Sequence, residues 1–252
     1  MSLRELITKA RKFFFGQRED SKSLEPEVPK IEDPAWDDAS REDLRDTLRN
    51  FIIGEVRLAN SDHGDILDTC REVYIEDDCP ENEWEDFVRF AKSELDDAAA
   101  KHSIDRESWS SETDNDRLDR VEASLREKDI LLWQVSPCCD TCSGAELPDR
   151  IDVIEGRCPG FRDRVRGYAF YIDQNMAEIL SESTEISVYL AYGWFAPNDS
   201  KVDSKEYEER ALGIAGEVCD CLREHGFEPD WDGSYSKKIG ISLNWQRRTM
   251  LS

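Results

Sequence analysis

Apolar side chains recur at helical spacing through most of the first half of the chain. Three such patterns follow one another with short connections, and they predict three amphipathic helices. Helices joined this closely pack into a small bundle, so we predict a helical subdomain over residues 39–102. The apolar positions are Leu44, Leu48, Phe51, Ile52 and Val56 in the first helix, Ile66, Cys70, Val73 and Tyr74 in the second, and Trp84, Phe87, Val88, Ala91, Leu95 and Ala98 in the third.

The pattern changes in the second half to strands that alternate with helices. Strict alternation of apolar and polar residues in 186–192 is typical of a half-buried strand, and the long apolar stripe in 207–225 predicts a helix. The expected fold class is α+β: a helical N-terminal subdomain followed by a mixed β-sheet packed with helices in residues 103–248. The predicted strands are 130–135, 165–172, 186–192, 227–231 and 239–245, the last two joined as a hairpin through Asp232-Gly233, and the other predicted helices lie near 114–125, 142–155 and 174–180.

The N-terminal region differs from both parts. Residues 1–18 hold five basic residues against one acidic residue, a net charge of +4, and their apolar residues follow a helical period. A basic amphipathic helix can lie on an anionic membrane or dock on a protein. Membrane contact through residues 1–16 is the less favoured role. Residues 19–38 are rich in Ser, Pro, Glu, Asp and Lys, which predicts a disordered linker.

Net charge and composition exclude several classes of function. The net charge of −24 over 252 residues repels nucleic-acid backbones, so we expect no nucleic-acid partner. No apolar run reaches the roughly 18 to 20 residues of a membrane-spanning helix, and no secretory signal is evident. Eight cysteines are too few for a disulfide-dense secreted domain. We therefore expect a soluble cytoplasmic protein with reduced thiols.

The most unusual chemistry lies directly after the strand at 130–135, where Cys138, Cys139 and Cys142 fall within five positions. Cys139 and Cys142 have the Cys-x-x-Cys spacing of zinc ribbons and of dithiol redox motifs. A structural zinc ion needs two further ligands, and Cys221 and His225 share one face of the predicted helix 207–225. The predicted zinc site is Cys139, Cys142, Cys221 and His225, with Cys138 or Cys158 as substitutes.

Two other interpretations of these cysteines stay open. Reduced, partly buried thiols at the end of a strand are the favoured one, because a single Cys-x-x-Cys is a weak zinc signal. A redox pair at Cys139 and Cys142, at the start of a helix, is less favoured than zinc. Zinc is the one cofactor for which the sequence offers candidate ligands.

Aromatic residues form a second candidate site. Tyr192, Trp194, Trp231 and Trp245 lie at or near predicted strand ends, and together on the surface they would make a binding site for a protein partner. Singly, each such residue is more often part of the core or its rim.

Catalytic signatures are missing from the sequence. The three histidines are scattered, and no nucleophile elbow, phosphate-binding loop or dinucleotide fingerprint occurs. We assign no catalytic residue. The favoured function is a non-enzymatic interaction or regulatory module with an unidentified protein partner, and the alternative is a metal-binding or thiol-based protein centred on residues 138–142.

The order of several short motifs resembles a bacterial family of uncharacterised proteins known only as a domain of unknown function. The resemblance is firmest over residues 113–248 and extends more loosely to about residue 40. It implies a bacterial cytoplasmic protein and carries no activity with it. The motifs are Thr113-Asp114-Asn115-Asp116-Arg117-Leu118, Cys138-Cys139-x-x-Cys142, Arg166-Gly167-Tyr168-Ala169-Phe170-Tyr171, Tyr189-Leu190-Ala191-Tyr192-Gly193, Trp231-Asp232-Gly233 and Trp245-Gln246-Arg247-Arg248.

Overall fold

A computed structural model of the chain describes residues 36–137, 139–196, 202–248 and 250. The basic segment 1–18 and most of the predicted linker, up to residue 35, lie outside the described residues. The end of that linker is part of the helical subdomain. Trp36 packs edge-on against Phe87 with ring centroids 5.9 Å apart, and its Nε1–H donates to Glu83 at 2.9 Å.

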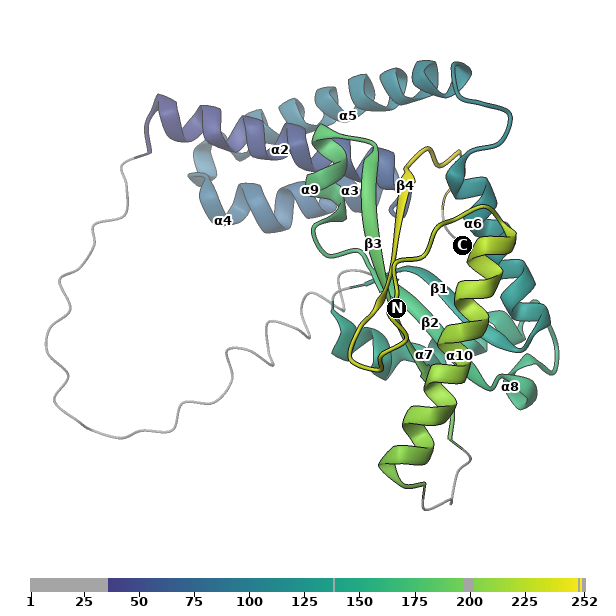
Figure 1. Ribbon diagram of the computed structural model, residues 1–252. Coiled ribbons are helices and arrows are strands. Elements are labelled where there is room, and N and C mark those ends of the chain that lie inside the picture. The colour runs from purple at the N-terminus through teal and green to yellow at the C-terminus, as the bar shows by residue number, and fades with distance from the viewer. Residues whose placement is uncertain (1–35, 138, 197–201, 249, 251–252) are drawn as a thin grey trace, which may run out of the picture.

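The helical subdomain is built on two long helices, α2 (Asp38–Leu58) and α5 (Trp84–Glu107), as Figure 1 shows. The Asp37 carboxylate caps α2 by accepting from the Ser40 N–H at 3.0 Å, which satisfies a backbone donor that the helix leaves free. Buried apolar residues of both helices form one core with those between them. The intervening elements are α3 (His63–Thr69), the π-helical turn η1 (Cys70–Ile75), α4 (Glu76–Asp78) and the 3-10 turn η2 (Glu81–Glu83).

The second part of the chain contains a four-stranded sheet and its helices. Thr113 and Asp116 form a reciprocal capping box at the start of α6, and Gly226, at φ +82°, follows the end of α10. The glycine after α10 is predicted from the sequence, whereas the cap of α6, expected near residues 114–116, is Thr113. In chain order the elements are α6 (Asp114–Glu127), β1 (Ile130–Ser136), α7 (Asp140–Glu155), α8 (Phe161–Arg164), β2 (Gly167–Ile172), α9 (Met176–Glu182), β3 (Glu185–Trp194), α10 (Ser204–Glu224) and β4 (Ile239–Asn244).

The strands lie side by side in chain order, β1-β2-β3-β4. β1 and β2 are parallel, and β3 is antiparallel to both β2 and β4, so the sheet is mixed. The predicted α+β class is therefore confirmed. Among the described residues, no helix combines the length and apolar composition needed to cross a lipid bilayer.

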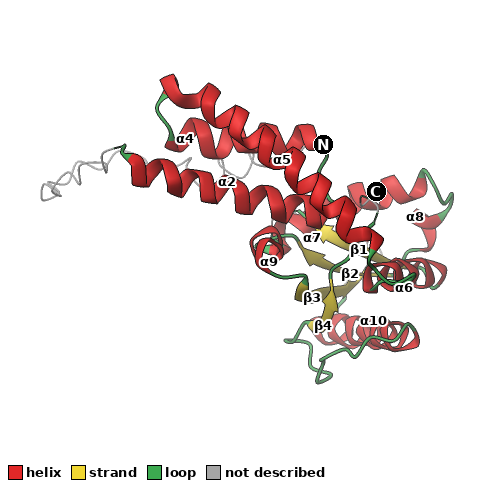
Figure 2. Ribbon diagram, turned by 90° about the horizontal axis from the view of Figure 1, so that it is seen from above, coloured by secondary structure: helices red, strands yellow, loops and turns green. Residues whose placement is uncertain are grey.

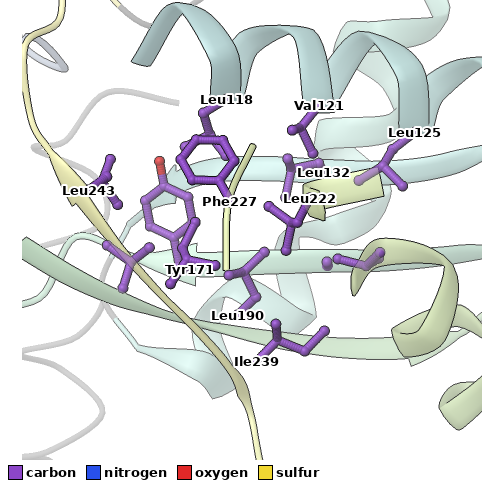
Figure 3. Packing of buried hydrophobic residues seen from close by; sticks show 14 of the residues in the cluster. Leu118, Val121, Leu125, Leu132, Tyr171, Leu190, Leu222, Phe227, Ile239 and Leu243 are labelled. Carbon is purple, nitrogen blue, oxygen red and sulfur yellow. The ribbon is translucent and has the colours of Figure 1, made fainter. Parts of the chain in front are cut away.

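Helices cover the two faces of the sheet unequally. α6 and α10 pack on one face, and their apolar side chains join those of all four strands in the main core (Figures 2 and 3). α7 packs on the opposite face, over β1 and β2. Over β3 and β4 that face carries Ser187 and Ser242, whose hydroxyls are 2.9 Å apart, and the exposed ring of Tyr189. The alternation of residues 186–192 follows from this one-sided burial.

One predicted strand is wrong. Residues 227–231 form no strand, and the expected hairpin with β4 is reduced to a single bridge between Asp230 and Gly240. Pro229 has no N–H to give to a strand ladder, and Phe227 turns into the main core, where it is 3% exposed. The segment crosses the end of the sheet instead of extending it.

Candidate functional site

A buried polar cluster links the C-terminal motif to β1. Arg247 is 3% exposed; its guanidinium donates to the Asp119 carboxylate at 3.0 and 3.2 Å and to Gln134 Oε1 at 2.7 Å. The Gln134 side-chain amide donates in turn to Asp119 at 2.9 Å and to Glu122 at 2.8 Å, both on α6. Gln134 faces α6 because it lies two residues after Leu132, which packs on the same face of the sheet, and a bulge then adds Val135, at φ +51°, to that face. Sequence analysis missed this cluster because its members are far apart along the chain.

The structure does not bring the predicted zinc ligands together. Cys139 is the N-cap residue of α7 and Cys142 lies in its first turn, while Cys221 lies on α10, on the other face of the sheet. Among the described residues, no three His, Cys, Asp or Glu side chains are placed to hold one metal ion. Cys138 lies outside the described residues.

The surroundings of Cys221 and His225 are those of packing residues. Cys221 is fully buried, with its sulfur 3.8 Å from the Val121 carbonyl oxygen, and His225 Nε2 is 3.0 Å from the Ser124 hydroxyl. Both contacts join α10 to α6. Cys158, the substitute ligand, is half-buried beside the α7 core. Cys70, Cys79, Cys142, Cys158, Cys219 and Cys221 are free thiols.

Thiol reactivity is expected to follow burial. Burial raises the pKa of Cys70 to about 12 and that of Cys219 to about 11, so neither forms an accessible thiolate at about pH 8. Iodoacetamide should modify Cys142 and Cys158 in the native protein, and Cys70 and Cys219 only after denaturation. Peptide mapping by mass spectrometry measures the order in which the cysteines are modified. Fast modification of native Cys70 would contradict the closed helical core.

Three of the four predicted binding aromatics, Tyr192, Trp194 and Trp231, are half-buried at the rim of the main core. Tyr192 and Trp231 touch edge to face with centroids 5.9 Å apart, and Trp194 contacts Tyr207 at 6.2 Å. Tyr235 joins the two pairs, at 6.4 Å from both Tyr192 and Tyr207. We call these five residues the aromatic surface.

Trp245, the fourth residue predicted to lie on the binding surface, does not lie there. It is 1% exposed in the main core, and its Nε1–H donates to the Arg57 carbonyl at 2.9 Å. A tryptophan that follows β4 is buried here because α2 of the helical subdomain lies over that end of the sheet (Figure 1). Sequence position does not reveal this neighbour.

The Trp231-Asp232-Gly233 motif builds a turn that supports the aromatic surface. Gly233 has φ +82°, a conformation that favours glycine, and the Asp232 carboxylate accepts from the Ser234 N–H at 2.9 Å. The Ser234 carbonyl then accepts from the Tyr192 hydroxyl at 3.0 Å and from the Trp231 indole at 3.2 Å. These hydrogen bonds hold the two rings in fixed positions.

The aromatic surface lies against the free end of β3. β4 pairs with β3 only as far as Leu190, so residues 191–194 pair with β2 alone. On the opposite face Tyr168 lies across Gly193, where an added Cβ would be 2.8 Å from Tyr168 Cε1. The Tyr168 hydroxyl is hydrogen-bonded to Tyr207. Aromatic side chains therefore enclose this strand end from both faces.

Two acidic residues lie near the aromatic surface, Glu208 beside Tyr235 and Asp232 beside Tyr192. Burial raises the pKa of Tyr235, and Tyr207 and the Glu208 carboxylate raise it further. Burial likewise raises the pKa of Tyr192, with smaller contributions from Tyr235 and Asp232. Both phenols are therefore neutral and act as hydrogen-bond donors at physiological pH. Tyr235 is 43% exposed, so the surface is open to solvent.

A cationic side chain of the protein itself contacts the face of one of these rings. The Arg210 guanidinium lies over Trp194, 5.7 Å from the ring centroid, and reaches Glu206 at 3.9 Å. One guanidinium thus contacts both an aromatic face and a carboxylate of the same surface. The aromatic surface can bind cationic groups by contact with π faces and nearby acids.

The chain belongs to the family defined by a domain of unknown function, DUF6891, whose model matches residues 41–249. This match confirms the family resemblance seen in the motif order, and it begins within α2. No match to the chain was found among curated proteins or among solved structures.

Proposed function

We propose that this protein is a non-enzymatic interaction module whose aromatic surface binds a basic segment of a protein partner. The observation that carries the proposal is the unbroken contact of five partly exposed aromatic rings, with Glu206, Glu208 and Asp232 nearby. Tyr and Trp bury large areas with few rotatable bonds, so they are the residue types that dominate protein interfaces.

The partner's chemistry follows from the charge around the rings. Glu206, Glu208 and Asp232 lie at the edge of the aromatic surface and favour a cationic ligand. The Arg210–Trp194 contact is an internal example of the same recognition. At long range, the net charge of −24 attracts a basic partner and repels acidic competitors.

Truncation of the exposed rings should abolish most of the binding. Tyr235→Ala and Trp231→Ala are each expected to weaken binding of basic peptides by about 30-fold, equivalent to about 2 kcal/mol. The measurement is fluorescence anisotropy on the full chain with labelled peptides of equal length, in which Arg and Lys are replaced stepwise by Glu. Affinity should fall with each replacement and with added salt.

Tyr189→Ala is the matched control. Tyr189 is also on β3 and is 58% exposed, but it lies on the open face of the sheet away from the aromatic surface. This variant should bind like the wild type. Equal losses in all three variants, or binding that does not depend on peptide charge, would refute the proposal.

A further inference from the structure

A cavity of about 290 Å³ lies where the C-terminal motif meets the helical subdomain. Four segments line it: the end of α2, the start of α3, the second half of α5 and the C-terminal residues after β4. Two of the three histidines of the chain, which are far apart in sequence, line this one cavity. The lining residues with polar side chains are Glu55, Ser61, His63, His102, Ser103, Arg106, Arg247 and Arg248.

From this arrangement we infer that the cavity is a binding site for a small organic anion carrying a carboxylate or phosphate group. The inference goes beyond the proposed interaction surface and does not depend on it. A volume of about 290 Å³ is at the lower limit of small-molecule pockets, which indicates a small metabolite.

The charges that line the cavity are unusual for this protein. In a chain of net charge −24, three arginines and two histidines line it against a single carboxyl group, that of Glu55. Arg248 is paired with Asp116 at 2.5 Å, and Arg247 is paired with Asp119. No carboxylate in the described part of the chain forms an ion pair with Arg106, whose side chain is exposed at the cavity. Its guanidinium is the first candidate to hold an anion.

The inner wall of the cavity is desolvated. His102 is half-buried and hydrogen-bonded to the backbone of Arg247. Burial, and next the charge of Arg106, lower its pKa, so its ring is neutral at physiological pH. The Ser103 hydroxyl adds a donor for an oxyanion.

Glu55 makes the site sensitive to protonation. Burial raises the pKa of Glu55 to about 7, the nearby Asp173 adds to the rise, and a hydrogen bond with Ser61 opposes it. Below this pKa the neutral carboxyl can donate a hydrogen bond to an anion, and above it the carboxylate repels one. The other titratable or charged groups around Glu55 are His63 on α3, Cys70 and Tyr74 on η1, His102 and Arg106 on α5, Asp173 after β2, and Arg247 and Arg248 at the C-terminal end.

Isothermal titration calorimetry on the full chain tests the site, with succinate and sulfate as probes because sulfate keeps its charge across the pH range. At about pH 6 we expect one-to-one binding of at least one probe with a Kd below about 10 mM. Preference for succinate identifies a carboxylate ligand, and preference for sulfate a phosphate-type ligand. Arg106→Gln should weaken binding about tenfold or more, because it removes a charge-assisted hydrogen bond.

Arg89→Gln is the control on the same helix, since Arg89 is exposed and ion-paired with Asp86. It should bind like the wild type. Absence of binding of both probes, or equal weakening by Arg89→Gln and Arg106→Gln, would overturn the inference.

The pH dependence of anion binding by the wild-type protein provides a second test, which does not require a variant that could unfold. Wild-type affinity should fall about tenfold between pH 6 and pH 8, since only the protein with a neutral Glu55 binds well and that fraction falls tenfold above its pKa. Glu55→Gln, a neutral isostere, should keep its affinity at pH 8; thermal melting confirms that it is folded. An unchanged pH dependence in folded Glu55→Gln would overturn the role of Glu55.

Discussion

Replacement of Trp245 with alanine is expected to lower the free energy of unfolding by about 4 kcal/mol. The indole ring is 1% exposed and lies in the main core, where its removal leaves a large cavity. Its Nε1–H donates to the Arg57 carbonyl at 2.9 Å, so the substitution also leaves a buried acceptor unsatisfied. This hydrogen bond joins the helical subdomain to the sheet, because Arg57 is on α2 and Trp245 follows β4. Urea denaturation followed by circular dichroism measures the change in the free energy of unfolding.

Trp245→Phe separates the two contributions. It keeps an aromatic ring in the core and removes the hydrogen bond, so its cost should be smaller, about 1–2 kcal/mol. Neither variant should change peptide binding at the aromatic surface under conditions where it is folded. A Trp245→Ala protein of unchanged stability that no longer binds basic peptides would show that Trp245 is a surface residue after all.

Replacement of Gly54 with alanine is expected to cost about 3 kcal/mol, even though alanine is the better helix former. Gly54 lies near the C-terminal end of α2, in the helix that contacts α9. An added Cβ would overlap the Ala177 carbonyl oxygen and lie 2.6 Å from its carbonyl carbon. These are backbone atoms, so no side-chain rotation relieves the clash and the two helices must separate. The expected readout is a lower urea midpoint with a similar slope.

Gly213→Ala on α10 is the matched control for Gly54→Ala. Gly213 is also inside a long helix, but an added Cβ there meets no atom within 4 Å. The substitution should therefore stabilise the protein by up to about 1 kcal/mol through helix propensity alone. If both variants changed stability equally, the close approach of α2 and α9 would not exist.

The contact at Gly54 also bears on how the two parts of the chain are connected. α9 links β2 to β3, and α2 is the first helix of the helical subdomain, so this crossing joins the sheet to the bundle (Figure 1). Together with the Trp245–Arg57 hydrogen bond, it makes the helical subdomain part of the wall of the anion cavity. Loosening the crossing is therefore expected to weaken succinate or sulfate binding as well.

The sequence by itself determined the class of the fold and most of its elements. Helical spacing located α2, α5, α6 and α10, and strict alternation located β3, because burial on one side imposes these periods on the chain. The glycine after α10 is a local signal that needs no knowledge of distant residues. The motif order indicated a family of unknown function, and the family model identified it.

Only the tertiary structure decided which distant residues meet. It separated Cys139 and Cys142 from Cys221 and His225, because the first pair is at the start of α7 and the second pair is on α10, and these helices lie on opposite faces of the sheet. It buried Trp245 beneath α2 and left Tyr192, Trp194 and Trp231 half-buried at the rim of the core, next to Tyr207 and Tyr235. It also brought Glu55, His63 and His102 to one cavity. Periodicity reports which side of an element is buried and not what lies against it, so contacts between remote segments depend on the packing of the whole chain.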